Sequence, residues 1–218
     1  QKESDWYIEA AKTAMQAGSM VYAGKYSAPD YETILENGCD LAIENTMIYH
    51  TPEVVEQLQS LGIPVLVERS SYESEPLGRM EWLKLYGALV GKADEACAQY
   101  DAILQQLDGV LDQTPTGKRV AFFYITTSGS VNVRKSADYI AKAIRMAGGD
   151  YVAFDESGEE NALSTMTIQM ETFYDTAVDA DVLIYNSTID GEIRTIDELL
   201  AKSPLLADFK AVKSGNVW

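Results

Sequence analysis

The sequence has little histidine and little cysteine, and this scarcity excludes most metal and thiol chemistry. Its 218 residues include one histidine, His50, and two cysteines, Cys39 and Cys97, which stand far apart. Two separated cysteines form neither a CxxC zinc pattern nor a disulfide framework, and a single histidine cannot make a metal site by itself. We therefore expect no metal site and no resident cofactor.

Positive charge is also scarce. The chain has 17 lysines and arginines against 34 acidic residues, which gives a formal charge of −17 and a sequence pI of about 4.3. Such a surface repels phosphate backbones, so we expect no nucleic-acid partner. No apolar run approaches the length of a membrane-spanning helix, so we expect no direct membrane insertion by this chain.

The usual catalytic motifs are missing as well. The sequence contains no GxSxG elbow, no GxxxxGK[ST] loop, and no GxGxxG that follows a predicted strand. The lone His50 would have to serve any serine or cysteine nucleophile. Abundant carboxylates alone do not distinguish a catalytic pair from solvated surface acids. We assign no catalytic residue and predict that the protein is not an enzyme.

A long amphipathic helix is predicted at Lys92–Asp112, near the middle of the chain. Its apolar residues recur at i, i+3, i+4 and i+7, and Asp94 and Glu95 lie where acids favour a helix N-terminus. Pro115 stops it. At about 1.5 Å per residue the helix is roughly 30 Å long. Cys97 falls on its apolar stripe, so we expect a buried thiol.

This helix separates two halves that both predict alternating strands and helices. The expected segments are an N-terminal lobe at 1–91, the connecting helix at 92–112 and a C-terminal lobe at 113–218. Strand–helix–strand patterns of this kind indicate parallel sheets. In the first half we expect strands at Asp40–Glu44 and Gly62–Glu68 around a helix at Thr51–Leu61. In the second half we expect strands at Arg119–Ile125, Tyr151–Phe154 and Val182–Tyr185, a polar loop at Thr126–Val131, and helices at Ser136–Ala147, Ser164–Val178 and Ile196–Lys202.

Polar and aromatic side chains follow several of the predicted strands. Ligands bind beyond the carboxyl ends of the strands in open parallel sheets, so these side chains are candidates to line one cleft. The alternative is that each hydroxyl or amide simply caps the following helix. Arg134 and Lys135 at a predicted helix start oppose the helix dipole, which an anionic ligand would rationalise. The candidate ligand-binding residues are Asn45, Thr46, Tyr49, Arg69, Ser71, Tyr72, Arg79, Tyr124, Thr127, Ser128, Arg134, Lys135, Asn186 and Ser187.

Three segments, in order, resemble motifs of one family. Pro29–Leu35 followed by Cys39–Ile43 is similar to a P-x-x-E-x-I segment that leads into C-D-L-V-I. Leu58–Val67 is similar to L-x-x-L-G-I-P-V, and Phe209–Trp218 to A-V-K-x-G-R-V-Y. The chain thus resembles the substrate-binding proteins of ABC importers for ferric siderophores, haem and vitamin B12. The resemblance implies an α/β fold with two Rossmann-like lobes and parallel central sheets, joined by one long, rigid helix.

The resemblance has two departures. The family's first strand and helix would precede Gln1, and its last helix would follow Trp218, so we expect an incomplete first lobe. It also implies one acidic residue on each lobe that docks on the membrane permease. Glu32 matches that position in the first lobe, and Glu171 is the candidate in the second.

The resemblance implies a function outside catalysis. The protein would be an extracytoplasmic solute-binding protein, periplasmic or lipid-anchored, that delivers an iron chelate or related metallo-ligand to an ABC importer permease. Cations and tyrosines suit carboxylate or catecholate siderophores. His50 and Tyr49 keep haem open as a ligand, because haem iron takes an axial His or Tyr. The alternative is an enzyme or metal-cofactor chaperone on the same chelatase-like fold.

Overall fold

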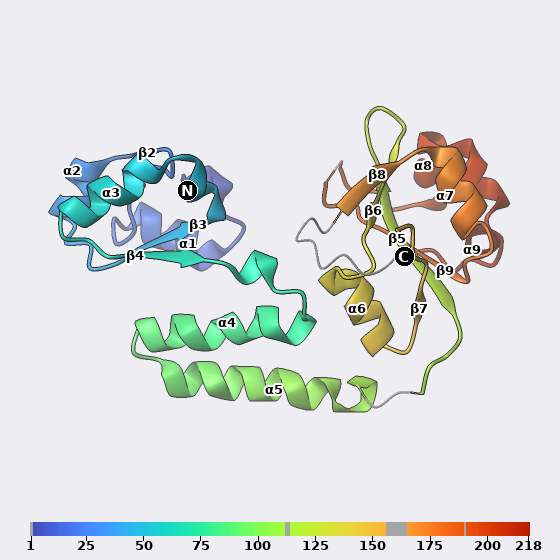
Figure 1. Cartoon of the computed structure of the whole chain (residues 1–218), viewed down its shortest axis with the longest axis horizontal. Coiled ribbons are helices and arrows are strands. Elements are labelled where there is room, and N and C mark those ends of the chain that lie inside the picture. The colour runs from blue at the N-terminus through green and yellow to red at the C-terminus, as the bar shows by residue number, and fades with distance from the viewer. Residues whose placement is uncertain (1, 112–113, 156–164, 190) are drawn as a thin grey trace. The chain divides into compact units, whose positions relative to one another are not determined.

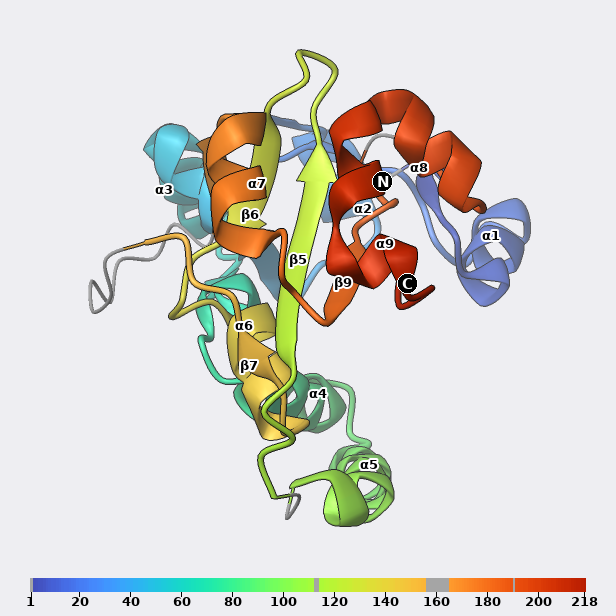
Figure 2. The same ribbon diagram turned by 90° about the vertical axis from the view of Figure 1, so that its right-hand side faces the viewer.

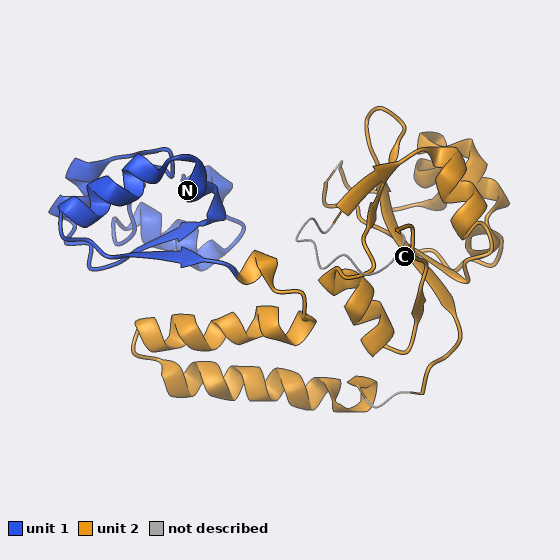
Figure 3. Ribbon diagram, in the orientation of Figure 1, with its two compact units in different colours: residues 1–69 blue, residues 70–218 orange. Residues whose placement is uncertain are grey.

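The computed structural model describes residues 2–111, 114–155, 165–189 and 191–218 (Figure 1). The chain forms two compact units, residues 1–69 and residues 70–218, which Figure 3 colours separately. Each unit is a continuous stretch of chain with strands and helices of its own. The α/β fold class expected from the sequence is confirmed. The boundary after residue 69 differs from the predicted segments 1–91, 92–112 and 113–218, because both long helices group with the second unit.

The first unit is built around a strand–helix–strand motif. Strands β3 and β4 pair in parallel, with Ala42 opposite Val65 and Asn45 opposite Glu68, as the sequence predicted. Helix α3 connects them, and its Val54 and Leu58 are buried with Ile48 and Ile63. The elements are η1 (Glu3–Asp5), α1 (Glu9–Gln16), β1 (Gly24–Lys25), β2 (Ala28–Pro29), α2 (Tyr31–Glu36), β3 (Ala42–Asn45), η2 (Thr46–His50), α3 (Pro52–Ser60) and β4 (Val65–Glu68).

The second unit opens with a helical hairpin. After η3 (Ser70–Tyr72), helix α4 (Pro76–Leu89) packs against α5 (Ala93–Leu111), which confirms the long helix at the positions that the structure describes. The helices touch at Gly87, where a Cβ would overlap that of Ala96. Ala96 and Tyr100 are buried on α5, but Cys97 is exposed. The predicted burial of the Cys97 thiol is therefore wrong, because an apolar stripe is buried only where another element covers it.

The central strand of the second unit is β5 (Arg119–Ile125), whose bounds match the prediction. Strand β9 (Val182–Tyr185) pairs with it in parallel on one edge. Strands β7 (Asp150–Tyr151) and β6 (Val131–Arg134) share its other edge, β7 parallel and β6 antiparallel, and β6 pairs with β8 (Thr165–Ile168). The sheet is thus mixed, whereas the sequence predicted parallel strands alone.

The sequence missed both antiparallel strands of this half: the loop predicted at Thr126–Val131 is present except that Val131 begins β6, and the helix predicted at Ser164–Val178 is present only from Met170. The loop expected at Thr126–Val131 is the turn of a hairpin, in which the Thr126 amide donates to the Ser130 carbonyl over 2.8 Å. The helix expected at Ser164–Val178 is strand β8 followed by the shorter helix α7 (Met170–Ala177); Ser164 lies outside the described residues. Alternating exposed and half-buried residues along β8 fit a strand that covers a core on one face.

Helices cover one face of this sheet. Figure 2 shows β5 running through the unit, with α7, α8 (Ile196–Lys202) and α9 (Lys210–Lys213) around its upper half. The rings of fully buried Phe123 and Phe173 are tilted against each other with their centroids 4.5 Å apart, and the Phe209 ring stacks on Phe173 at 5.5 Å. The segment η4 (Pro204–Asp208) adds Leu206 to the same core. Helix α6 (Tyr139–Met146) lies beside the lower half of β5 in Figure 2.

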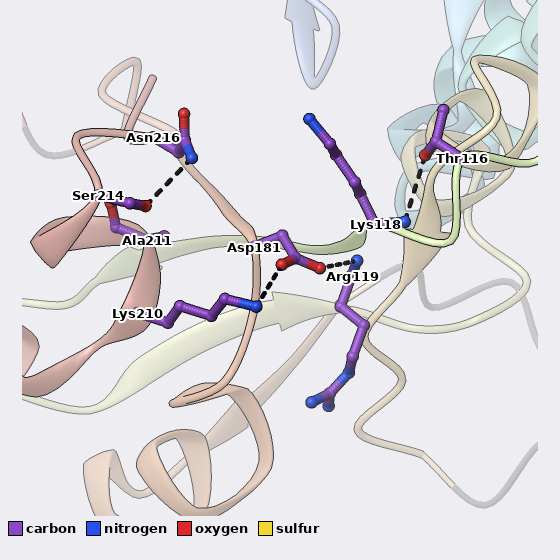
Figure 4. Close-up of polar contacts among 8 residues, drawn as sticks. All are labelled: Thr116, Lys118, Arg119, Asp181, Lys210, Ala211, Ser214 and Asn216. Atoms are coloured by element: carbon purple, nitrogen blue, oxygen red, sulfur yellow. Dashed lines mark hydrogen bonds and ion pairs between the residues drawn. The ribbon is translucent and has the colours of Figure 1, made fainter.

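An acidic side chain ties the start of β5 to the end of the chain. The Asp181 carboxylate accepts hydrogen bonds from the Arg119 amide over 2.8 Å and from Lys210 Nζ over 2.6 Å (Figure 4). These bonds, with that from Lys210 the larger cause, lower the pKa of Asp181. Val217 then forms a parallel bridge to Leu183 of β9, so the last residues lie along the sheet edge.

Candidate functional site

The sheet of the second unit has one face that is only partly covered. Tyr124 on β5 lies opposite Asn132 on β6, which lies opposite Thr167 on β8. Opposed residues point to the same face, so these three side chains form a row across the sheet. Tyr124 and Asn132 are half-buried and Thr167 is exposed, and the Asn132 amide donates to Thr167 Oγ1 over 3.3 Å. We name this row, with Arg134 beside it, the open sheet face.

The open sheet face carries no negative charge from its own strands. Strands β5, β6, β8 and β9 contain no aspartate or glutamate, although the chain has 34 acidic residues; the fifth strand, β7, has Asp150, which lies opposite Arg119 at the start of β5 and not in the row of Tyr124. The charged side chain that this face does carry is Arg134, whose guanidinium carbon lies 5.8 Å from the centre of the Phe122 ring. A neutral or anionic ligand group fits such a face better than a cationic one.

Arg134 is held by a buried carboxylate. Its guanidinium lies 3.7 Å from Asp138, whose side chain is 1% exposed. Asp138 is the N-cap of α6 and accepts the Ile140 amide over 2.9 Å. Burial raises the pKa of Asp138. Helix α6 begins at Tyr139, four residues after Lys135, so the predicted clash of this cation pair with the helix dipole is wrong.

Four further candidates lie near the carboxyl end of β5. Thr127 and Ser128 are exposed in the hairpin turn, where Ser128 Oγ lies 2.9 Å from the hydroxyl oxygen of Thr126. Asn186 follows β9, and its backbone amide donates to the Phe123 carbonyl over 2.8 Å. Its side-chain oxygen accepts from the Thr188 hydroxyl over 2.6 Å, with Ser187 between them.

The candidates Ser71, Tyr72 and Arg79 lie at the start of the second unit, close to α4. The Arg79 guanidinium donates to the backbone carbonyls of Ser71 and Glu73. Its central carbon stands 3.7 Å from the centre of the Tyr139 ring. Arg79 is therefore occupied by the protein itself, which the sequence pattern did not indicate.

In the first unit the candidates gather at one edge of the β3–β4 pair. Asn45 ends β3 opposite Glu68, and exposed Arg69 follows directly. Asn45 also caps η2, because its side-chain oxygen accepts the Met47 amide over 2.8 Å. The capping alternative therefore holds for Asn45. Thr46 and Tyr49 lie in η2, and Tyr49 is 60% exposed.

A groove of about 790 Å³ lies beside β3 in the first unit. Apolar and aromatic side chains make up most of it, and Asn45 reaches its edge. Burial raises the pKa of Glu44, which also lines it. The groove is lined by Lys2, Asp5, Val21, Tyr22, Ala23, Gly24, Lys25, Tyr26, Pro29, Ile34, Cys39, Ala42, Ile43, Glu44, Asn45 and Leu58.

The two candidate docking acids are both exposed at the first turn of a helix. Glu32 lies in α2 and Glu171 in α7. Among the described residues, no group of three or more His, Cys, Asp or Glu side chains is arranged to hold a metal ion. Within the described part of the chain, no helix has both the length and the apolar character that a membrane span requires.

Asn132 and Thr167 belong to the open sheet face but were not among the predicted residues. Their signal is a period of two: Val131–Arg134 and Thr165–Ile168 each alternate a buried or half-buried apolar residue with a polar one. Both stretches lie in segments that the sequence assigned to a loop and a helix. The alternation identifies both strands and places Arg134 on the same face as Asn132.

Comparison with known proteins places this fold. The periplasmic binding protein family matches residues 3–218. A lipoprotein of Methanocaldococcus jannaschii is 28% identical over 225 residues, which cover 100% of this chain and 51% of that protein. A second lipoprotein of that organism is 28% identical over 95% of this chain and 53% of its own length. The chain thus spans about half the length of these curated relatives.

Solved structures share the fold at low sequence identity. The periplasmic haem-binding protein of Vibrio cholerae superimposes with a TM-score of 0.71 at 19% identity, over 93% of this chain and 76% of that one. A siderophore-binding protein, bound to two molecules of acinetobactin and ferric iron, gives 0.66 at 18% identity over 97% and 71%. Since the family match spans nearly the whole sequence, the chain belongs to the periplasmic binding protein family.

Proposed function

We propose that the protein is an extracytoplasmic solute-binding protein that delivers a metal chelate, such as a ferric siderophore, haem or a cobalamin, to an ABC importer. Family membership over residues 3–218 is the observation that carries this proposal. The structural neighbours include proteins that bind haem and a ferric siderophore, and the curated relatives are lipoproteins. A lipid anchor on the outer face of the cell membrane is the localisation that these relatives support.

The open sheet face supplies the ligand contacts of the second unit in this proposal. A half-buried tyrosine, two neutral hydrogen-bonding side chains and Arg134 suit a flat ligand with oxygen atoms at its rim. The absence of acidic residues from the four strands keeps repulsion low for an anionic chelate. Carboxylate and catecholate siderophores fit this chemistry, and haem propionates offer the same groups.

The first unit supplies its contacts from the carboxyl edge of β3 and β4. Arg69 and Tyr49 are exposed there, where a ligand can contact them. Thr46 directly follows Asn45 at the start of η2. Tyr49 is also the residue that would give haem an axial oxygen ligand. The family match favours a binding protein over the alternative of an enzyme or metal-cofactor chaperone on a chelatase-like fold.

The test is a titration of the protein with ferric siderophores, haem and cobalamin, followed by tyrosine and tryptophan fluorescence. We expect one class to quench the fluorescence saturably. Tyr124→Ala should weaken that binding about tenfold, the effect of about one lost hydrogen bond with its packing. Tyr7→Ala is the matched control, because Tyr7 is 98% exposed. Failure of all three ligand classes to bind would overturn the proposal.

Permease docking has a separate test in proteoliposomes that contain the cognate importer. In the proposal Glu32 and Glu171 each meet a permease arginine. Glu32→Ala should lower the ATPase stimulation, whereas Glu36→Ala, at the other end of the same exposed helix, should not. Glu171→Ala should lower it in the same way, and its control is Asp175→Ala, an exposed acid on the same helix α7. Equal stimulation by the variant and its control would remove that acid from the docking surface.

A further inference from the structure

The segment Ser70–Glu75 contains η3 and leads into α4, and we call it the crossover. Within it the Glu73 amide donates to the Ser70 carbonyl over 3.1 Å. Its side chains Ser71 and Ser74 are exposed. A short polar segment of this kind is ordinarily among the more mobile parts of a chain, unless other groups fix it.

Arg79 is the group that fixes the crossover backbone. Its Nε donates to the Glu73 carbonyl over 2.8 Å, and a terminal nitrogen donates to the Ser71 carbonyl. The guanidinium thus bridges two carbonyls that are two residues apart. Such charge-assisted bonds are stronger than neutral ones, and a planar fork with fixed donors is needed to make both.

The same guanidinium also reaches a different part of the second unit. It lies over the ring of Tyr139, the first residue of α6, with 3.7 Å between its carbon and the ring centre. A cation at this distance is attracted by the face of the ring. Arg79 therefore joins three pieces of chain: the crossover, its own helix α4, and α6.

Neighbouring contacts reinforce this junction. The Trp82 indole donates to the Glu73 carboxylate over 3.2 Å, and Lys142 of α6 donates to the Ser74 hydroxyl over 3.1 Å. Lys142 also pairs with the Glu75 carboxylate. The exposed fractions of the Lys142 and Glu75 side chains, 28% and 65%, make that ion pair the weaker contact.

We propose that Arg79 is a clamp that makes the crossover part of the rigid body formed by α4 and α6. The crossover then moves with α4 and α6 as one body. This assignment gives Arg79 a conformational task in place of the ligand contact expected from the sequence. It does not depend on the identity of the ligand.

Hydrogen exchange of the Glu73 amide, measured by mass spectrometry of peptides that cover the crossover, tests the clamp without any ligand. Arg79→Ala removes both backbone bonds and the ring contact, so exchange should accelerate about ten- to hundredfold. Lys142→Met is the control for the neighbouring contacts: it removes the Ser74 bond and the exposed ion pair with Glu75, leaves both Arg79 bonds in place, and should change exchange by less than threefold. Peptides from β5 and β9 should exchange as in the wild type, which shows that the unit remains folded.

Two further variants separate the parts of the clamp. Arg79→Lys keeps the charge but cannot bridge both carbonyls, so we expect exchange nearly as fast as in Arg79→Ala. Tyr139→Leu removes the ring contact but leaves both backbone bonds of Arg79, so it should give an intermediate rate, with the Trp82 fluorescence shifted in the same order. The proposal is overturned if Arg79→Ala leaves crossover exchange within twofold of the wild type, or if Lys142→Met accelerates it equally.

Discussion

Two glycines on the helical hairpin, Gly87 and Gly109, give matched tests of how tightly its helices pack. A Cβ at Gly87 would overlap the Cβ of Ala96 and lie 3.0 Å from the Lys92 carbonyl oxygen, whereas one at Gly109 would meet nothing within 4 Å. Both residues lie inside helices, so each change to alanine gains up to about 1 kcal/mol of helix propensity. Gly87→Ala alone also incurs overpacking, which costs about 1–3 kcal/mol.

The difference between the two variants isolates the contact. Because the propensity gain appears in both, Gly109→Ala should exceed Gly87→Ala in unfolding free energy by about 1–3 kcal/mol. For a protein of this size, each kcal/mol moves the midpoint by about 2–4 °C. Gly109→Ala should therefore melt above the wild type, and Gly87→Ala should melt roughly 2–12 °C below Gly109→Ala.

Calorimetry with circular dichroism at 222 nm measures these shifts. The two probes must give the same midpoint for the transition, because two compact units need not unfold together. Equal upward shifts in both variants would refute the reasoning. That result would mean that the helices separate enough at Gly87 to accept a methyl group.

Three further predictions concern single side chains of the second unit, all measured by thermal melts. Bonds from Lys210 and Arg119 lower the pKa of Asp181, so its stabilising effect is present above the ordinary value of 3.8 and is lost as the pH falls further; Asp181→Asn should melt below the wild type at pH 7, and the gap should close in acid. Burial raises the pKa of Asp138, so its contribution is full below 3.8 and declines as the pH rises; Asp138→Asn, which keeps a capping oxygen, should gain on the wild type from pH 4 to 7, and parallel pH curves for the two variants would contradict both assignments. Thr195→Ala removes the capping box of α8 and should cost about 0.5–2 kcal/mol, whereas Thr195→Asn should cost less; equal losses would show that the cap contributes little.

Elements whose pattern is local were predictable from the sequence. Strand β5 and helix α8 have the predicted bounds, and α5 departs from its predicted range by one residue at its start. In each, a single periodicity runs from end to end between clear stop signals. The helix predicted over Thr165–Ile168 was wrong because these four alternating residues lie just before helix α7, and only their pairing with β6 makes them a strand.

The site depends on partners that no local pattern specifies. Arg79 and Arg134 look alike in the sequence as cations that could contact an anionic ligand. The structure gives Arg79 two backbone carbonyls and a tyrosine ring, and places Arg134 beside a buried aspartate on an open face. Cys97 shows the same limit: its place on an apolar stripe is local, but its burial depends on what covers the stripe.

The chain passes between its two compact units once, after Arg69. A pulling force applied at residues 1 and 218 therefore acts on the two units in series, and each unit bears the full force. Since an extended chain spans at most about 3.3–3.6 Å per residue, unravelling releases at most roughly 240 Å from the first unit and roughly 510 Å from the second, less the distance that each folded unit already spans. Among the described residues, the core cluster of the first unit has four buried residues and that of the second has fifteen, so the first unit should yield first and a single molecule under tension would lengthen by the short step first.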